Sequence, residues 1–448
     1  MGAGVSRLFG TDGIRGVANV DLKPTLAYAL GRATAHHLAG PGGAIVVGQD
    51  TRRSCDMLVA ALAAGAASLG VDVHQAGVVP TPALAFLAAS GPYRAGIMVS
   101  ASHNPADDNG LKVLDHDGRK LDDPVEDELE RLIWRSEELG GPHNGELGII
   151  VDARGSLERY VEHRLALAQA VDGRGLRVVL DCANGSGGVV APRILEATGA
   201  TVHVIHNAPD GRNINVDCGA TVPATMARAV VERGADIGFA LDGDADRLIA
   251  ADAAGRVVDG DLILGILALD RLGRAALPNG TLVVSVLSNG GLQAAVEAAG
   301  GTVVRTPVGD KYIVDGMAVA GAALGGEKSG HLIIAEQTTS GDGIVSALEV
   351  LAVLRRSRCD LATLAARIPL LPQHQRTVPA RHKDQWEGDV AIRSAIRRAE
   401  QQLGGSGRVL VRPSGTEPAL RVMVEGEDEA LVAELADALA ALAGERLN

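Results

Sequence analysis

Residues 236–247 read DIGFALDGDADR, a short apolar run followed by three aspartates at every second position. The apolar run predicts a strand, because short apolar runs that end at a turn signal are typical of strands. In an extended or looping backbone this spacing directs the carboxylates of Asp242, Asp244 and Asp246 to one side. Crowded carboxylates repel one another unless a cation lies among them. The stretch therefore predicts either a divalent cation site or an acidic surface turn.

A calcium EF-hand loop is the competing interpretation of this spacing. Such a loop requires Gly at its sixth position and Glu at its twelfth. The chain has Arg247 and Ala253 at these positions. The stretch is therefore not an EF-hand.

The composition is that of a multidomain globular protein. A chain of 448 residues is too long for one core, and 46% hydrophobic with 22% charged residues excludes a disordered chain. An aromatic content of 2% and a net charge of −13 argue against a nucleic-acid partner. We also expect no membrane association, because no apolar stretch is long enough to span a bilayer. Four widely scattered cysteines indicate reduced thiols and predict a cytoplasmic location.

Strand patterns alternate with helical patterns along most of the chain, which is typical of parallel α/β units. The pattern runs through three successive cycles, at residues 44–100, 177–241 and 282–355. We therefore expect an α/β fold with three related mixed α/β domains, over residues 1–153, 154–254 and 255–370. The last region, residues 371–448, shows two strands and two helices and predicts a small α+β domain. The polar, Pro-bearing stretch 372–384 is expected to be the linker into it.

Residues 100–105 read SASHNP and follow an apolar strand pattern, where α/β sheets place loops that contact ligands. A hydroxyl there is either a nucleophile or phosphate carrier, or part of an ordinary turn. We expect the chain to turn at Asn109-Gly110 and to bring the Lys112 amine back to this loop. A lysine can act as an acid or a base there if its pKa is lowered.

Three other Gly-rich loops carry polar side chains. Residues 9–16 read FGTDGIRG, with Arg15 as the basic group. Residues 325–331 read GGEKSGH, a set that suits either sugar hydroxyls or a polar turn. Residues 412–418 read RPSGTEP, which suits either a phosphate-binding nest or an ordinary Ser-Gly turn. Neither a Walker A sequence nor a complete G-x-G-x-x-G is present, so the sequence does not support nucleotide binding.

Taken together and in this order, the five loops resemble the α-D-phosphohexomutase superfamily over essentially the whole chain. The combination is far more specific than any one loop: FGTDGIRG, SASHNP with DNGLK, DGDADR, GGEKSGH and RPSGTEP. With VGDKY at residues 308–312, the chain is most similar to the bacterial branch that interconverts glucosamine 6-phosphate and glucosamine 1-phosphate. That isomerase reaction supplies UDP-N-acetylglucosamine, an amino-sugar precursor of the cell wall. The resemblance implies four domains arranged around a central cleft.

The resemblance also implies a role for each loop. Ser102 would carry the phosphoryl group, and Mg²⁺, one per chain, would be held by the phosphoserine with Asp242, Asp244 and Asp246. The implied catalytic residues that surround the phosphoryl group are Arg15, His103, Lys112 and Arg247. Lys112 would be the general acid/base. The implied contacts to the sugar or to the phosphate that is not transferring are Glu327, Ser329, His331, Lys311, Arg412, Ser414, Gly415, Thr416 and Arg421.

The mechanism implied by the resemblance uses one phosphoserine and one phosphate clamp. The phosphoserine donates to the free hydroxyl of a small phosphosugar, and a glucosamine or glucose 1,6-bisphosphate forms. The bisphosphate turns end over end and returns its other phosphate to Ser102. The C-terminal domain, which carries the clamp, is expected to hinge. The resemblance also allows a homodimer.

The chain departs from the pattern of the superfamily in three places: Ala106-Asp107, Lys311 and Lys328. Lysine at 311 lacks the fork of donors that the frequent arginine provides. Two alternatives remain: the same mechanism acting on mannose or glucose phosphates, and a catalytically silent scaffold paralogue. The presence of Ser102, the three aspartates, Lys112 and Arg247 argues against the scaffold.

Overall fold

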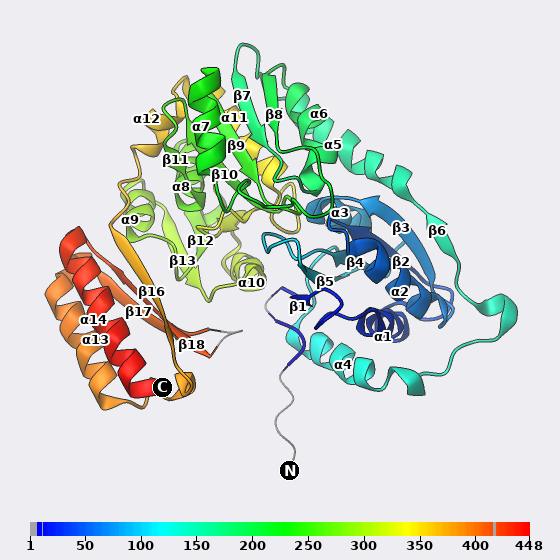
Figure 1. The fold of residues 1–448 in the computed structure, drawn as a ribbon. Helices are drawn as coiled ribbons and strands as arrows, with labels where there is room; N and C mark the ends of the chain where they lie inside the picture. Colours follow the sequence, from blue (N-terminus) through cyan, green and yellow to red (C-terminus); the bar gives the residue numbers. More distant parts are fainter. Residues whose placement is uncertain (1–6, 11, 415–417) are drawn as a thin grey trace. The chain divides into compact units, whose positions relative to one another are not determined.

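The computed structural model describes residues 7–10, 12–414 and 418–448, and the chain divides into two compact units (Figure 1). The first unit consists of the chain up to Leu287 together with Ala299–Arg367. The second consists of Ser288–Ala298 and Ile368–Asn448. Within the described residues, the first unit contains three sheets and the second contains one.

The first sheet has six strands in the order β1-β5-β4-β2-β3-β6. Their bounds are β1 Ile14–Val17, β5 Asp108–Asp115, β4 Ala95–Val99, β2 Ala44–Gln49, β3 Asp72–Val78 and β6 Ile150–Asp152. The helices of this region are α1 Pro24–Thr34, α2 Cys55–Ala67, α3 Thr81–Ser90 and α4 Asp123–Trp134. Strand β2 is parallel to β3 and β4, whereas β5 is antiparallel to β4 and β1. The sheet is therefore mixed, which confirms the expected mixed α/β domain.

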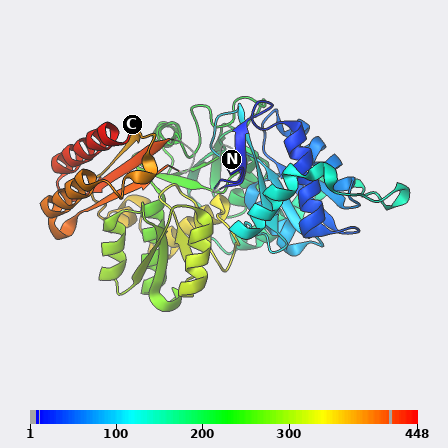
Figure 2. The same cartoon turned by 90° about the horizontal axis from the view of Figure 1, so that it is seen from below.

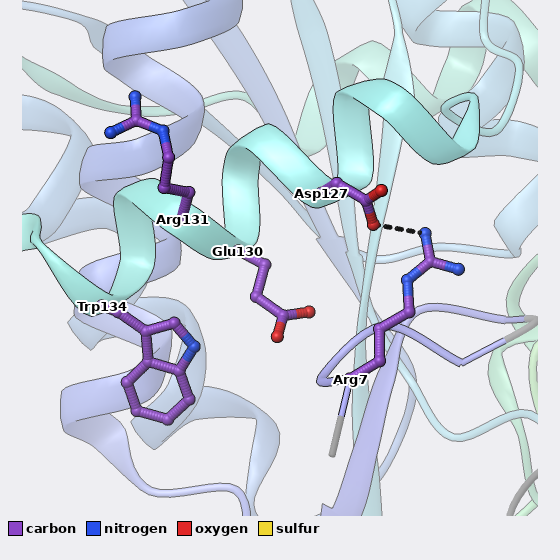
Figure 3. A pocket seen from close by; sticks show the side chains of 5 residues that line it. All are labelled: Arg7, Asp127, Glu130, Arg131 and Trp134. Atoms are coloured by element: carbon purple, nitrogen blue, oxygen red, sulfur yellow. Dashed lines mark ion pairs between the residues drawn. The ribbon is translucent and has the colours of Figure 1, made fainter. Parts of the chain in front are cut away.

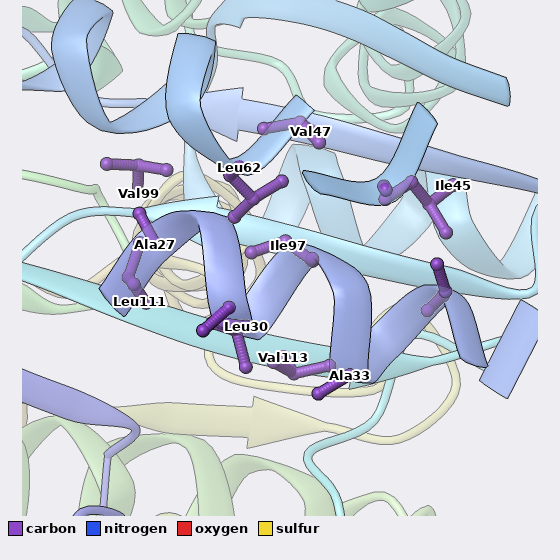
Figure 4. Close-up of a cluster of buried hydrophobic side chains, with 14 of the residues drawn as sticks. Ala27, Leu30, Ala33, Ile45, Val47, Leu62, Ile97, Val99, Leu111 and Val113 are labelled. Atoms are coloured by element: carbon purple, nitrogen blue, oxygen red, sulfur yellow. The ribbon is translucent and has the colours of Figure 1, made fainter. Parts of the chain in front are cut away.

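The core around this sheet is built from aliphatic side chains, as the scarcity of aromatic residues requires (Figure 4). Leu30 of α1 and Leu62 of α2 pack with Ile45 and Ile97 of the central strands, and all four are fully buried. Gly65 of α2 lies against the carbonyl group of Tyr28 in α1, where a Cβ atom would overlap with the carbonyl oxygen. The two helices therefore approach each other closely because α2 has no side chain at this position.

The second sheet has the strand order β11-β10-β9-β7-β8. The strands are β7 Arg177–Asp181, β8 Thr201–Ile205, β9 Ile237–Leu241, β10 Leu248–Asp252 and β11 Val257–Val258. The helices around it are α5 Leu157–Gln169, α6 Ala191–Glu196 and α7 Ala224–Arg233. The predicted apolar strand is β9, which is buried at every position and antiparallel to β10. The aspartate stretch forms the connection between these two strands.

The third sheet has the strand order β13-β12-β14-β15. Its strands are β12 Thr281–Ser285, β13 Thr302–Thr306, β14 Leu324–Gly326 and β15 Leu332–Ile334, and its helices are α8 Gly260–Gly273, α10 Asp310–Ala320, α11 Gly343–Ser357 and α12 Leu361–Ala365. The connection from β14 to β15 carries the GGEKSGH motif. Among the described residues, none of the helices has the length and the apolar character needed to cross a membrane.

The second unit contains a three-stranded antiparallel sheet in the order β16-β18-β17. Helices α13 and α14 lie side by side against this sheet in both views of the ribbon (Figures 1 and 2). The elements are β16 Gln373–Pro379, α13 Val390–Leu403, β17 Arg408–Pro413, β18 Ala419–Glu425 and α14 Glu429–Leu447, and α9 Gly290–Ala298 belongs to the same unit. The expectation of a linker at 372–384 is wrong, because most of this stretch forms β16. As an edge strand, β16 exposes alternate residues, which explains its polar sequence.

The expected turn at Asn109-Gly110 is also wrong, because both residues lie within β5. Gly110 pairs with Arg15 of β1, and its carbonyl oxygen accepts the Ser100 amide at 3.0 Å. The chain reverses earlier, between the end of β4 and the start of β5. Lys112 still returns to the Ser102 loop, since it lies opposite Met98 of β4.

Replacing Gly65 with Ala should lower the free energy of unfolding by about 1–3 kcal/mol, because the new methyl group forces α1 and α2 apart. Gly273→Ala is the matched control, since Gly273 also lies in a helix of the first unit but has no heavy atom within 4 Å of its Cβ position. The control should leave the stability unchanged or slightly higher. Equal denaturation midpoints for the two variants would contradict the close packing of α1 on α2.

Candidate active site

Ser102 lies in the loop that follows β4, and the structure places its hydroxyl against the aspartate loop. Its Oγ donates a hydrogen bond to Asp242 Oδ2 at 2.6 Å. The residue is 1% exposed and has a φ of +51°, a left-handed conformation that is unusual for a residue other than glycine. The Ser102 backbone is therefore held in an uncommon shape that turns the hydroxyl toward Asp242.

The three aspartates converge as their spacing predicted, with one oxygen of each within 4.8 Å of the others. All three are buried, which rules out the acidic surface turn. Burial, followed by repulsion from Asp246 and Asp244, raises the pKa of Asp242 well above its usual range. Among the described residues, Asp244 Oδ1 and Asp246 Oδ1 have no hydrogen-bond partner. Unsatisfied buried carboxylate oxygens are ligands for a hard cation, so the residues present fit a metal site.

Lys112 extends from β5 into the aspartate cluster. Its Nζ lies 2.8 Å from Asp244 Oδ2 and 3.1 Å from Asp12 Oδ2. Burial disfavours the charged amine, but Asp12, Asp244 and Asp246 outweigh burial and raise the pKa of Lys112. Proton exchange at neutral pH requires a lowered pKa. In this arrangement the surrounding carboxylates favour the ammonium form of Lys112 beside Ser102 and the triad.

Two arginines complete the basic surroundings of Ser102. The Arg247 amide donates to Asp242 Oδ1 at 3.2 Å, and its Nε lies 3.8 Å from Asp246 Oδ1. Arg15 of β1 donates to Asn104 Oδ1 at 3.1 Å. The predicted residues Arg15, Lys112 and Arg247 are therefore brought together around one loop.

The pKa values of the two predicted histidines are shifted in opposite directions. Nδ1 of His103 lies 3.2 Å from Ser102 Oγ, and burial, followed by repulsion from Arg247 and Arg15, lowers the pKa of His103 to about 4. Burial also acts against the charge on His331, but Asp246 and Asp310 outweigh it and raise the pKa to about 9. At neutral pH His103 is therefore neutral, whereas His331 is drawn toward its protonated form by Asp246, although its Nε2 accepts the Gly341 amide at 3.0 Å.

The other predicted sugar-side residues lie in and near the β14 to β15 loop. Glu327 Oε1 accepts the Gly309 amide at 3.1 Å, and Ser329 is exposed. An isolated β-bridge between Arg247 and His331 joins this loop to the aspartate loop. Lys311, at the start of α10, forms an ion pair with Asp123 of α4.

The predicted phosphate clamp lies in the second unit, on the β17 to β18 hairpin. Arg412 and Arg421 are opposite each other in the strand pair, and the Ser414 amide donates to the Ala419 carbonyl at 2.8 Å. Gly415 and Thr416 lie outside the described residues. The hairpin therefore brings both arginines to neighbouring positions.

Four consecutive domain matches cover most of the chain. They are to domain I of phosphoglucomutase/phosphomannomutase over residues 6–140, domain II over 158–255, domain III over 259–370 and the C-terminal domain over 375–442. The chain belongs to the phosphoglucomutase/phosphomannomutase family. The resemblance inferred from the five loops is thereby confirmed, as are the three α/β domains and the small C-terminal domain.

Individual relatives agree with this membership. The phosphoglucosamine mutase of Moorella thermoacetica is 50% identical over 430 residues, which cover 95% of this chain and 96% of that protein. The phosphoglucosamine mutase of Symbiobacterium thermophilum is 48% identical and covers 97% of this chain and 98% of that protein. A crystal structure of a phosphoglucomutase/phosphomannomutase family protein from Burkholderia thailandensis matches with a TM-score of 0.83 and 27% identity, over 99% of this chain and 98% of that chain.

Several residues of the site were not predicted from the sequence. Asp12 accepts hydrogen bonds from Arg15 and Lys120, and Lys120 also lies 2.7 Å from Asp310. Thr81, at the start of α3, donates to Asp244 Oδ2 at 2.6 Å. Asp12 belongs to the FGTDGIRG loop, so its place in that motif could have indicated it. Asp310 likewise belongs to the VGDKY stretch, whereas Thr81 and Lys120 carry no local signal.

Two other features are separate from this site. A surface pocket of about 470 Å³ beside α4 is lined by Arg7, Asp127, Glu130, Arg131 and Trp134, with an ion pair of 2.9 Å between Arg7 and Asp127 (Figure 3). A second group of potential metal ligands consists of Asp181, His206 and Cys218. Both oxygens of Asp181 accept backbone amides there, so this carboxylate shapes its own loop.

Divalent cation binding at the triad is testable without an activity assay. Adding MgCl₂ should raise the melting temperature of the wild-type protein, because a ligand that binds only the folded state stabilises it. Asp244→Asn should lose most of this increase, although Asn retains an oxygen for Thr81 and Lys112. Asp172→Asn, an exposed carboxylate elsewhere in the first unit, should keep the full increase. An unchanged increase in Asp244→Asn would rule out the triad as the metal site.

Proposed function

We propose that the chain is a phosphoglucosamine mutase, which interconverts glucosamine 6-phosphate and glucosamine 1-phosphate for UDP-N-acetylglucosamine synthesis. The observation that carries the proposal is the 2.6 Å hydrogen bond from Ser102 Oγ to Asp242. It places a hydroxyl at a buried carboxylate cluster flanked by Lys112, Arg247 and Arg15. The choice of glucosamine is supported by curated relatives of that name at 50% and 48% identity.

In the proposed reaction Ser102 is the phosphate carrier. The free hydroxyl of the bound sugar phosphate attacks the phosphorus, the bond from phosphorus to Ser102 Oγ breaks, and the hydroxyl proton leaves to a base. The product of this half-reaction is a 1,6-bisphosphate of glucosamine. In the second half-reaction its other phosphate returns to Ser102 Oγ. The same bisphosphate, or its glucose counterpart, would phosphorylate an unmodified enzyme.

Charge stabilisation is the role that the contacts of Lys112, Arg247 and Arg15 support. A transferring phosphoryl group carries negative charge that fixed cations in a dry site stabilise. Lys112 is held as an ammonium group by its carboxylate partners, so we assign it to this role first. A part for Lys112 in proton transfer requires that the bound substrate or metal draws these carboxylates away.

The metal in this proposal is Mg²⁺, held by Asp242, Asp244, Asp246 and a phosphoserine oxygen at Ser102. Oxygen ligands of this kind suit Mg²⁺, which when bound neutralises part of the phosphoryl charge. The two unpartnered oxygens of Asp244 and Asp246 are the observation in favour of this assignment.

The remaining predicted residues would recognise the substrate. Glu327, Ser329 and His331 offer acceptors and donors to sugar hydroxyls, and Lys311 is the neighbouring cation. Arg412, Ser414, Gly415, Thr416 and Arg421 would bind the phosphate that is not transferring. The cysteines at the described positions are all free thiols, which supports the proposed cytoplasmic location. A homodimer belongs to the same proposal, and light scattering in solution measures it.

Replacing Ser102 with Ala should abolish phosphorylation of the enzyme and lower turnover on the order of 10³-fold or more, because the phosphate carrier is lost. Intact mass after incubation with glucose 1,6-bisphosphate should show one added phosphoryl group in the wild type and none in the variant. Ser90→Ala, an exposed serine at the end of α3, is the control and should be phosphorylated normally. A phosphorylated, active Ser102→Ala variant would refute the assignment.

Substrate choice is decided by comparing kcat/KM for glucosamine, glucose and mannose phosphates with one enzyme preparation. We expect glucosamine phosphate to be preferred by roughly 10-fold or more, because a site built around one polar substituent discriminates against analogues that lack it. Equal or better turnover of the neutral sugars would favour a phosphomannomutase or phosphoglucomutase. Absence of turnover with all three sugars would favour the scaffold.

A further inference from the structure

A buried arginine that no part of the proposed chemistry uses lies directly beneath the Ser102 loop. Arg52 follows β2, is 2% exposed, and points its guanidinium group at the backbone of this loop. It donates to the carbonyl oxygens of Ser102 at 3.0 Å, Asn104 at 2.8 Å and Asp108 at 2.9 Å, and also to that of Pro105. One side chain therefore binds four carbonyl groups along the turn from β4 to β5.

Asp50 binds the remaining donor of this guanidinium group. Its Oδ2 accepts the fifth donor, Arg52 Nε, at 2.9 Å, so all the donating nitrogens of the side chain are engaged. The same oxygen accepts the Ser100 hydroxyl at 2.7 Å, and Ser100 Oγ in turn accepts the Ser102 amide at 2.9 Å. The amide and the carbonyl group of Ser102 are thus both held by the buried group of Asp50, Arg52 and Ser100.

These hydrogen bonds hold Ser102 in an unfavourable backbone conformation. A left-handed φ costs a residue with a side chain about 1–2 kcal/mol, and it persists only where the surroundings fix it. Asn215, from the region of the second sheet, adds a further hydrogen bond to the Ser102 carbonyl at 2.9 Å. Arg52 nevertheless makes most of these contacts. It binds four carbonyl groups of the loop, whereas Asn215 binds only those of Ser102 and Asn104.

We propose that Arg52, oriented by Asp50 and assisted by Ser100, positions Ser102 so that its oxygen faces the aspartate triad. Arg52 touches neither the Ser102 hydroxyl nor the triad, so it is a positioning residue and not a catalytic one. The proposal rests on the proposed role of Ser102 as the phosphate carrier. It predicts that loss of the arginine fork disorders one loop while the fold remains.

The test compares Arg52→Lys with Arg32→Lys. Arg32 of α1 is a matched control, because it is also buried in the first sheet region and also binds loop carbonyls, those of Ser136 and Leu139. A lysine at either position keeps the charge but cannot contact several carbonyls at once. Both variants should therefore lose some thermal stability, but only Arg52→Lys should lose the fixed position of Ser102.

At a temperature where circular dichroism shows both variants folded, Arg52→Lys should lower kcat about 100-fold with a change in KM of less than about threefold. Arg32→Lys should keep kcat within about twofold of the wild type. Hydrogen exchange should accelerate in Arg52→Lys at the amides of residues 101–109, while β2 and β3 exchange as in the wild type. Exchange that rises across the whole domain, or a kcat near the wild-type value, would overturn the proposal.

If Arg52→Lys does not fold, Ser100→Ala is the second variant that tests the proposal. It removes one small hydroxyl, and should lower kcat about 10-fold and accelerate exchange at the Ser102 amide. Wild-type values for both measurements would overturn the proposal. Hydrogen exchange tests the positioning role of Arg52 separately from the proposed function. If the wild type turns over no sugar phosphate but exchange in the loop still depends on Arg52, the proposed function is wrong and the positioning role of Arg52 is supported.

Discussion

Mutual repulsion among three buried carboxylates is the constraint on which the rest of the site depends. Asp242, Asp244 and Asp246 lie within 4.8 Å of one another and away from water, an arrangement that is unfavourable without positive charge. The fold supplies that charge from Lys112 on β5 and from Arg247 at the end of the aspartate loop itself, and His331 before β15 lies 3.6 Å from Asp246. The first, second and third sheets are therefore held together at the triad by electrostatic attraction as well as by packing.

The positive groups have carboxylate partners of their own, so the charges form a connected network. Lys112 and Lys120 share Asp12, Lys120 and His331 share Asp310, and His331 returns to Asp246. Removing one member of a buried network leaves another charged group unpaired. The network fixes the Ser102 side of the site, and among the described residues it leaves two carboxylate oxygens of the triad free of hydrogen bonds.

The parts of this site that follow from local sequence could be predicted, and the parts that depend on tertiary contacts could not. The strand at Ile237–Leu241 and the carboxylate loop after it are local features, and both were predicted correctly. Lys120 had no such signal, because its partners Asp12 and Asp310 are 108 and 190 residues away. The Asn109-Gly110 pair suggested a turn, but Gly110 is needed for close approach to the Ser100 carbonyl group, where a Cβ atom would overlap. The polar sequence of β16 suggested a linker, because an edge strand needs few apolar residues.

The rigidity of the Ser102 loop also bears on which component moves in the proposed reaction. Transfer from one end of a sugar and return to the other end requires that either the phosphate carrier or the bisphosphate change its orientation. Ser102 is fully buried, its amide and carbonyl groups are both bonded, and its left-handed backbone is held by Arg52 and Asn215. Swinging this residue would break these bonds together, whereas a bisphosphate released from covalent attachment loses none of them. In the proposed reaction the bisphosphate is therefore expected to be the component that turns, while Ser102 stays in place for both half-reactions.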